Sequence, residues 1–125
     1  MIYSVIVPVY KNEDTLVRLL EALESVQVEL GGGLEAVFVV DGSPDRCFEI
    51  LKEALPKMGF AAQVIAHSRN FGSFAAVRTG LAAARAEFFA VMAADLQEPP
   101  ELVVKFFRAL EAGECEVAIG TRLAR

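Results

Sequence analysis

The sequence predicts an α/β protein whose mostly parallel sheet carries helices on both faces. Short apolar runs alternate with segments of helical period, and each strand–helix unit spans roughly 25 residues, enough for the crossover between parallel strands. The apolar runs are nearly unbroken and rich in Val, Ile and Phe, which is typical of strands buried on both faces. This alternation indicates a layered α/β domain.

The strands are expected where the apolar runs lie, and the helices fill the segments between them. The order is therefore strand, helix, strand, and so on, with a strand at each end. The predicted strands are Val5–Val9, Ala36–Val40, Ala62–Ala66, Phe88–Ala93 and Val117–Ile119.

The first two helices show an apolar face and recognisable ends. Asn12 is placed to cap the first helix, and Gly31 stops it. Ser43 followed by Pro44 indicates a cap and a first-turn proline for the second helix. The apolar faces comprise Leu16, Leu19, Leu20 and Leu23 in the first helix, and Ile50, Leu51, Ala54 and Leu55 in the second.

The next two helices differ in the size of their side chains. The helix after Gly72 is rich in small residues, which indicates close packing on the sheet. The helix after Pro99 and Pro100 has large apolar residues on one face and is stopped by Gly113. The small residues are Ala75, Ala76, Gly80, Ala82, Ala83 and Ala84, and the large ones are Leu102, Val103, Phe106, Phe107 and Leu110.

Composition fits one domain over residues 1–125 and excludes several partners. With 54% hydrophobic residues the chain can build a sizeable core, and a net charge of -5 argues against nucleic acid as a partner. Cys47 and Cys115 lack CxxC spacing, which favours thiols in a reducing compartment. The N-terminus lacks a basic signal-peptide start, and the apolar stretch Phe88–Leu96 is far below the ~20 residues of a membrane span. We therefore expect a soluble, cytoplasmic domain.

Ligands of parallel sheets bind outside the carboxyl ends of the strands, so the loops after the strands are the candidate site. After the first strand, Pro8 turns the chain, Tyr10 offers a ring face to a base, and Glu13 offers a carboxylate. After the second, Asp41 can accept hydrogen bonds from a base or a ribose. The alternative interpretation of these residues is a strand end, a turn and a helix start.

The loop after the third predicted strand contains a cationic side chain and a glycine that lets a ligand approach the backbone closely. Arg69 can hold a phosphate or pair with a carboxylate, and Gly72 opens a helix whose start attracts anions. His67 is interpreted as a strand-end residue and not as a catalytic base. After the fifth strand, Arg122 can approach a diphosphate, or it is an exposed arginine near a terminus.

The fourth loop predicts a cation site. Asp95 follows seven nonpolar residues, and a carboxylate at the end of such a strand is costly to bury without a partner. A divalent cation bound to a diphosphate is such a partner, because it takes oxygen ligands from protein, phosphate and water. Asp95 and the Gln97 amide oxygen can supply two of them, and Glu98 can contribute or lie in the first helical turn. The alternative is that Asp95 caps or tightens a turn.

Taken together, these loops resemble glycosyltransferase family 2, which has the Rossmann-like GT-A fold. The third and fourth motifs are most similar to the branch that transfers sugars to polyprenyl or dolichol phosphates. The motifs run in order along nearly the whole chain: Val5 to Tyr10 with Asn12 and Glu13, Val39 to Ser43 with Asp45, Arg69 to Gly72, Asp95 to Gln97 with Pro99 and Pro100, and Gly120 to Arg122.

The resemblance implies a donor site and a reaction. The chain would be the donor-binding part of a longer enzyme, at the cytoplasmic face of a membrane if the acceptor is a lipid phosphate, with its catalytic base beyond Arg125. The donor would be a sugar carried by UDP, GDP or a similar group, and the acceptor and a homo-oligomeric state stay open. The metal, Mg²⁺ or Mn²⁺, would be held by Asp95 and Gln97. The implied donor-binding residues are Pro8, Tyr10, Glu13, Asp41, Arg69, Ala94, Asp95 and Arg122.

At two positions where the family pattern has an aspartate, this sequence has another residue. Val40 stands where the family has the first of two aspartates before Gly-Ser, and Ala93 stands where it has the first aspartate of Asp-x-Asp. The second loss is expected to weaken metal or donor binding. A non-catalytic relative retained for binding or assembly is therefore the alternative function. A flavodoxin-like signalling module fits less well, because it needs an aspartate in the third loop, where Arg69 stands.

Overall fold

A computed structural model of the chain describes residues 2–97 and 99–114. Strands and helices alternate along it, as the sequence predicts. In chain order the elements are β1 (Tyr3–Val9), α1 (Leu16–Leu30), β2 (Leu34–Asp41), α2 (Cys47–Ala54), the 3₁₀ turn η1 (Leu55–Lys57), β3 (Ala61–His67), α3 (Ser73–Ala83), β4 (Phe88–Val91) and α4 (Pro100–Glu111).

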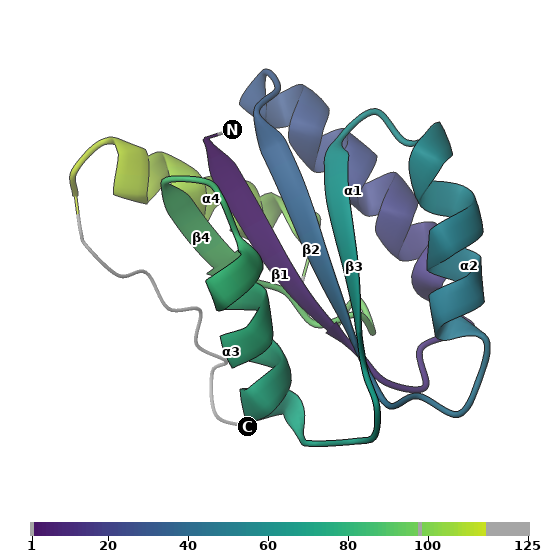
Figure 1. The fold of residues 1–125 in the computed structure, drawn as a ribbon. Coiled ribbons are helices and arrows are strands. Elements are labelled where there is room, and N and C mark those ends of the chain that lie inside the picture. Colours follow the sequence, from purple (N-terminus) through teal and green to yellow (C-terminus); the bar gives the residue numbers. More distant parts are fainter. Residues whose placement is uncertain (1, 98, 115–125) are drawn as a thin grey trace, which may run out of the picture.

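The sheet has four parallel strands in the order β3-β2-β1-β4. The chain first builds the sheet outward from β1 through β2 to β3, and then returns to place β4 on the other side of β1. The strand order therefore reverses at β1, and such a reversal is where ligands bind in open parallel sheets. Figure 1 shows the four strands side by side, with their carboxyl ends at one edge of the sheet.

Helices cover both faces, as expected. The side chains of α1, α2 and α4 belong to one large core against the sheet, whereas α3 is the one helix of the described residues that packs on the opposite face (Figure 1). The large core is filled by the alternate residues of β1 and β2 that face α1 and α4, together with the helices' apolar stripes. Its largest members include Leu16, Leu19, Leu23, Leu34, Phe38, Leu51 and Phe107.

The α3 face is thinner and is packed on small residues, as predicted. Its core contains Val37, Val39 and Ala76. Gly80 of α3 lies so close to the sheet that a Cβ there would come within 2.4 Å of Cγ2 of Ile6. Because a helix can approach a sheet this closely only without a side chain at the contact, the glycine sets the distance between α3 and β1.

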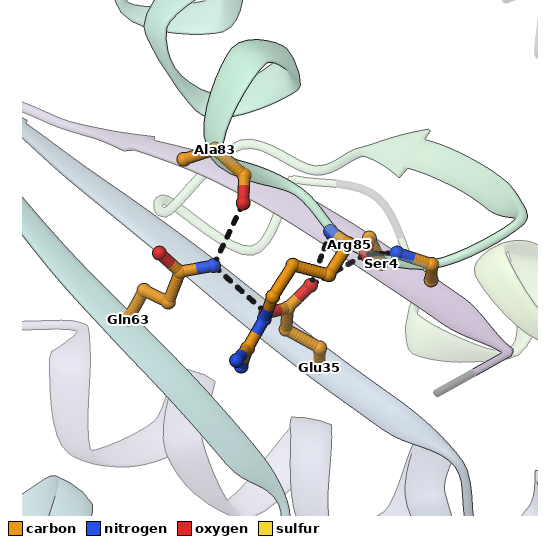
Figure 2. Close-up of polar contacts among 6 residues, drawn as sticks. Ser4, Glu35, Gln63, Ala83 and Arg85 are labelled. Atoms are coloured by element: carbon orange, nitrogen blue, oxygen red, sulfur yellow. Dashed lines mark hydrogen bonds and ion pairs between the residues drawn. The ribbon is translucent and has the colours of Figure 1, made fainter.

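A buried polar cluster ties the end of α3 to the amino-terminal half of the sheet (Figure 2). The Glu35 carboxylate is fully buried and accepts hydrogen bonds from Ser4 Oγ at 2.8 Å, from Gln63 Nε2 at 2.8 Å and from the Arg85 backbone N–H at 3.0 Å. It also pairs with Arg85 Nε at 2.8 Å, and Gln63 donates to the Ala83 carbonyl at 2.9 Å. Glu35 directly precedes the predicted second strand and was not among the residues singled out from the sequence.

Several element boundaries differ from the prediction. The α1 helix begins at Leu16 with Thr15 at the cap position, and Asn12 instead accepts the Tyr10 backbone N–H with its side chain. The α2 helix begins at Cys47, after the predicted Ser43 and Pro44, and the Asp45 carboxylate accepts the Cys47 N–H at 3.3 Å.

The outer strands also differ from the prediction. The β4 strand ends at Val91, two residues before the predicted end at Ala93. The strands buried on both faces are β1 and β2, whereas β3 and β4 are only partly buried. The predicted strand Val117–Ile119 lies outside the described residues. Within residues 2–97 and 99–114, the helices are all too short or too polar to cross a bilayer.

Candidate functional site

The carboxyl ends of the strands form a cleft of about 560 Å³. It lies at the reversal of strand order, and residues at or just after the carboxyl ends of the four described strands line it. Five residues expected at the donor site are among them, drawn from three distant parts of the chain. The lining residues are Pro8, Val9, Tyr10, Asn12, Asp41, Asn70, Gly72, Ser73, Val77, Val91, Ala93, Ala94 and Asp95.

The loop after β1 presents an aromatic ring at the cleft. Tyr10 is 40% exposed, and the ammonium group of Lys11 lies 5.3 Å from the centre of its ring. The loop is fixed by two hydrogen bonds, one from the Tyr10 backbone N–H to Asn12 Oδ1 at 2.9 Å and one from the Lys11 N–H to Ser43 Oγ at 2.8 Å. Lys11 adopts a left-handed conformation with φ of 55°. The ring is therefore held on a defined turn with a face available for stacking.

The loop after β2 places a nearly buried carboxylate beside the cleft. Asp41 is 3% exposed, and its Oδ1 accepts the Phe71 backbone N–H at 2.9 Å and bonds to His67 Nδ1 at 2.8 Å. Its Oδ2 accepts the Gly72 N–H at 2.9 Å. Burial raises the pKa of Asp41, but the hydrogen bonds from Phe71, His67 and Gly72 outweigh it, so that the pKa lies below its ordinary value. Asp41 is therefore ionised at neutral pH.

The loops after β2 and β3 touch each other directly. Gly42, with φ of 66°, has the Arg69 carbonyl carbon 2.2 Å and the Asn70 nitrogen 2.3 Å from where a Cβ would stand. Asn70 Nδ2 also donates to the Asp41 backbone carbonyl at 3.2 Å. Only glycine permits this contact, so the Asp-Gly pair that indicated a turn also brings the two loops together.

Arg69 does not line the cleft. Its guanidinium lies 4.2 Å from the centre of the Phe71 ring, and both side chains are exposed. Glu13 and Gln97 are also exposed and outside the cleft lining, and Arg122 lies outside the described residues. The structure thus brings together Pro8, Tyr10, Asp41, Ala94 and Asp95, whereas Glu13, Arg69 and Gln97 are not among the residues that line the cleft.

Asp95 lines the cleft, but it is exposed and not buried as the apolar run before it had indicated. The β4 strand ends at Val91, so Asp95 lies on a loop; Ala94 before it is buried, but Asp95 itself is exposed. Its Oδ1 accepts the Gln97 backbone N–H at 3.2 Å across Leu96, which has a left-handed φ of 60°. The neighbouring Ala94 carbonyl accepts Thr15 Oγ1 at 2.8 Å, which ties this loop to the start of α1.

A metal at this site would draw most of its ligands from elsewhere. In the described part of the chain, no three His, Cys, Asp or Glu side chains gather as a metal site. Asp95 is one exposed carboxylate at the cleft, and Ala93 offers no ligand. One carboxylate suits a Mg²⁺-type ion held chiefly by phosphate oxygens and water.

Two residues of the site were missed or underrated. His67 ends β3, as expected, but it also bonds to Asp41 and, through Nε2, to Thr79 Oγ1 of α3 at 2.8 Å. Asn70 lines the cleft. Strand pairing was the missing signal, since the register places His67 opposite Asp41. Cys47 is a buried free thiol, and burial raises its pKa to about 11.

Comparison with known protein families gives a match over almost the whole chain. A family model described as "Glycosyl transferase family 2" matches residues 4–125. An undecaprenyl-phosphate 4-deoxy-4-formamido-L-arabinose transferase of Pseudomonas aeruginosa is 37% identical over 110 residues, which is 88% of this chain and 32% of that protein. A dolichol-phosphate mannosyltransferase of Pyrococcus furiosus is 35% identical over 122 residues, 98% of this chain and 33% of that protein. The chain spans about a third of the length of these relatives.

Solved structures share the fold. TarS of S. aureus, residues 1–349, superposes with a TM-score of 0.73 at 24% identity, covering 91% of this chain and 33% of that one. The mannosyltransferase PcManGT of Pyrobaculum calidifontis, in complex with GDP-Man and Mn²⁺, superposes with a TM-score of 0.75 at 22% identity, covering 86% and 32%.

Proposed function

Because the chain belongs to glycosyl transferase family 2, we propose that its cleft binds a nucleoside-diphosphate sugar. The observation that carries the proposal is the convergence of Tyr10, Asp41 and Asp95, from the carboxyl ends of three strands, on one cleft of about 560 Å³ at the switch in strand order. An aromatic face, an ionised acceptor and an exposed carboxylate are the groups that a base, a ribose and a metal-bound diphosphate need. Residues 1–125 would then form a single donor-binding region.

The nucleoside would lie over the β1 and β2 loops. The Tyr10 ring stacks on the base, and Pro8 shapes the wall beneath it. A carboxylate has about four acceptor positions, and Asp41 uses three, for Phe71, Gly72 and His67. The fourth is left for a base N–H or a ribose hydroxyl.

The diphosphate would lie toward the β4 loop, against Ala94 and Asp95. A divalent cation, Mg²⁺ or Mn²⁺, would be held by Asp95 and by the amide oxygen of Gln97, the rest of its ligands coming from phosphate and water. When bound, it neutralises charge on the leaving diphosphate. We also propose that Glu13 and Arg69 contact the ends of a bound donor, because both stand on loops that contribute other residues to the cleft lining.

The reaction follows from the donor. An acceptor oxygen attacks the anomeric carbon, the bond from that carbon to the diphosphate oxygen breaks, and the nucleoside diphosphate leaves with its electron pair. The P. aeruginosa and P. furiosus relatives carry undecaprenyl phosphate and dolichol phosphate in their names. By that similarity we propose a polyprenyl phosphate as the acceptor and a UDP- or GDP-type sugar as the donor.

The experiment is calorimetric titration of the chain with UDP and GDP, each with and without Mn²⁺. We expect weak binding that Mn²⁺ strengthens, and we expect Asp95→Asn to remove the Mn²⁺ effect while nucleotide binding without metal persists. The matched control is Asp14→Asn, which neutralises an exposed carboxylate outside the cleft lining. Absence of binding to every nucleotide tested would reject the proposal.

A non-catalytic binding or assembly role is the second candidate, and Ala93 is the observation that favours it. Ala93 lines the cleft where the family pattern has an aspartate. Ala93→Asp separates the two functions. Under the donor-binding proposal this substitution strengthens Mn²⁺-dependent nucleotide binding, because a second carboxylate joins Asp95. Under the assembly role, neither metal nor nucleotide affinity appears after the substitution.

A further inference from the structure

Three side chains from three elements form a continuous hydrogen-bonded chain behind the cleft. Thr79 of α3 bonds to Nε2 of His67 at 2.8 Å, and Nδ1 of that histidine bonds to Asp41 Oδ1 at 2.8 Å. The His67 side chain is 13% exposed and that of Asp41 4% exposed. Neither His67 nor Thr79 lines the cleft. His67 and Thr79 can therefore act on a ligand only indirectly, through Asp41 and the loop that it holds.

Asp41 in turn holds part of the cleft wall. Its two oxygens accept the backbone N–H groups of Phe71 and Gly72, both at 2.9 Å. Gly72 has φ of 100° and lines the cleft immediately before α3. The side chain of Phe71 lies edge-on to the His67 ring, with the ring centres 5.4 Å apart. The conformation of this loop therefore depends on where the Asp41 carboxylate stands.

We propose that His67 and Thr79 are positioning residues for this cleft, holding the Asp41 carboxylate where it fixes the loop at Gly72. In the neutral histidine, Nδ1–H donates to Asp41 and Nε2 accepts the Thr79 hydroxyl proton. In the charged form, Nε2–H donates to the hydroxyl oxygen, because a hydroxyl can reverse its role. The chain of bonds is thus complete in both protonation states. The role in ligand binding rests on the proposed function, whereas the role in loop geometry does not.

The first test measures the loop without any ligand. Amide exchange by NMR on the intact 125-residue chain reports the Phe71 and Gly72 N–H groups directly. His67→Leu and Thr79→Val keep the side-chain volume and remove the bonds, and we expect the exchange of these two amides to accelerate roughly tenfold to a hundredfold. His67→Asn, whose amide can take the place of Nδ1–H, and Thr79→Ser, which keeps the hydroxyl, should restore slow exchange.

The matched control lies on the same strand. Gln63 of β3 also donates to a buried β2 carboxylate, that of Glu35, and to α3 through the Ala83 carbonyl. Gln63→Leu therefore removes a similar set of bonds at the opposite end of the strands. It should lower stability while leaving the exchange of the Phe71 and Gly72 amides, relative to global unfolding, unchanged.

The second test adds nucleotide. The affinity for the nucleotide bound by the unsubstituted chain should fall roughly tenfold in His67→Leu and in Thr79→Val, recover in His67→Asn and Thr79→Ser, and stay unchanged in Gln63→Leu. Normal amide exchange in His67→Leu and Thr79→Val would overturn the proposal, as would an equal loosening of the loop in Gln63→Leu. If the unsubstituted chain binds no nucleotide, the proposed function fails, and the exchange data still decide whether His67 and Thr79 position the loop.

Discussion

Asp41 and Glu35 are buried carboxylates of one strand, and each is held by donors from β3 and from the segment that begins or ends α3. Asp95, by contrast, is exposed on a loop. A buried carboxylate with several donors stays ionised and rigid, whereas an exposed one is free to exchange water for a ligand. The buried carboxylates therefore hold the structure, Asp41 at the cleft and Glu35 at the opposite end of β2, whereas the exposed Asp95 is suited to bind a cation.

Because of Glu35, the free energy of unfolding is expected to fall at acidic pH. Burial raises the pKa of Glu35, but hydrogen bonds from the Arg85 N–H, Gln63, Ser4 and the Arg85 side chain outweigh it and lower the pKa from 4.5 to about 2. Because the folded-state pKa is depressed, this stabilisation is complete above pH ~4.5 and is lost as the pH falls toward ~2. We expect the loss from this group to reach about 3 kcal/mol.

Urea unfolding between pH 7 and pH 2 checks this prediction, with Glu35→Gln as the variant. The glutamine keeps the shape of the side chain and removes the charge, so the variant should be less stable at pH 7 and should show a flatter profile below pH ~4.5. Glu87→Gln, at an exposed position, is the control. A parallel decline of variant and unsubstituted chain below pH ~4.5 would show that Glu35 does not carry the acid dependence.

At the scale of residues, a position at the strand ends could be predicted where the signal was local. Tyr10 and Asp41 stand at strand ends that their own apolar runs define, and both line the cleft. Glu35 and the His67–Asp41 bond were missed because they depend on which residues face each other across β2 and β3. The burial of Asp95 was predicted wrongly because the apolar run continues past the end of β4.

At the scale of elements, α3 differs from the other helices in how it packs on the sheet. It contributes Ala76 and Gly80 as its buried residues, and its ends are held by the polar groups around Asp41 and Glu35. The other helices bury Leu, Val and Phe side chains. Close approach and polar anchoring thus replace large apolar side chains on this face.

Gly80→Ala tests the close approach. Alanine favours a helix by about 1 kcal/mol over glycine, but its Cβ would come within 2.4 Å of Cγ2 of the buried Ile6. Because overpacking of this kind costs roughly 1–3 kcal/mol or more, we expect a net loss of stability. Urea unfolding measures it.

A double substitution tests whether contact with Ile6 causes the loss of stability in Gly80→Ala. Ile6→Ala removes Cγ2, so the combined variant should lose less stability than the sum of the two single losses. Purely additive losses, or a gain in stability for Gly80→Ala alone, would contradict the packing argument.

Over the whole molecule, the sheet separates a thick core from a thin one. The core beneath α1, α2 and α4 holds most of the buried apolar side chains, and the α3 face holds Val37, Val39 and Ala76. Regions with few buried apolar contacts open at lower free energy than the global transition. We therefore expect α3 to open separately from the rest.

Native-state hydrogen exchange in low urea measures that opening. The amides of α3 should exchange through an opening at least about 1–2 kcal/mol below the free energy of global unfolding, whereas those of β1, β2 and α1 should follow the global transition. Exchange of α3 only through global unfolding would contradict the prediction. Because α3 begins at the cleft wall, such an opening would also loosen the site.

The architecture was predictable because each element carries its own periodicity. The parallel sheet, the helices on both faces and the position of the cleft follow from the order of apolar runs, and the structure confirms them. The helix caps at Asn12 and Ser43 were wrong, since several polar residues compete for each helix start and the choice depends on neighbouring loops. The fifth strand and Arg122 remain predictions.

The two carboxylates of β2 also bear on how the sheet assembles. Glu35 and Asp41 lie an even number of residues apart and so point to the same face of the strand. A one-residue slip of β2 past its neighbours would turn both into the thick apolar core, where an unpartnered negative charge is strongly unfavourable. A misaligned pairing of β2 would thus bury an unpartnered charge at each end of the strand. The correct alignment, which lets the chain fold, also leaves the Asp41 carboxylate beside the cleft.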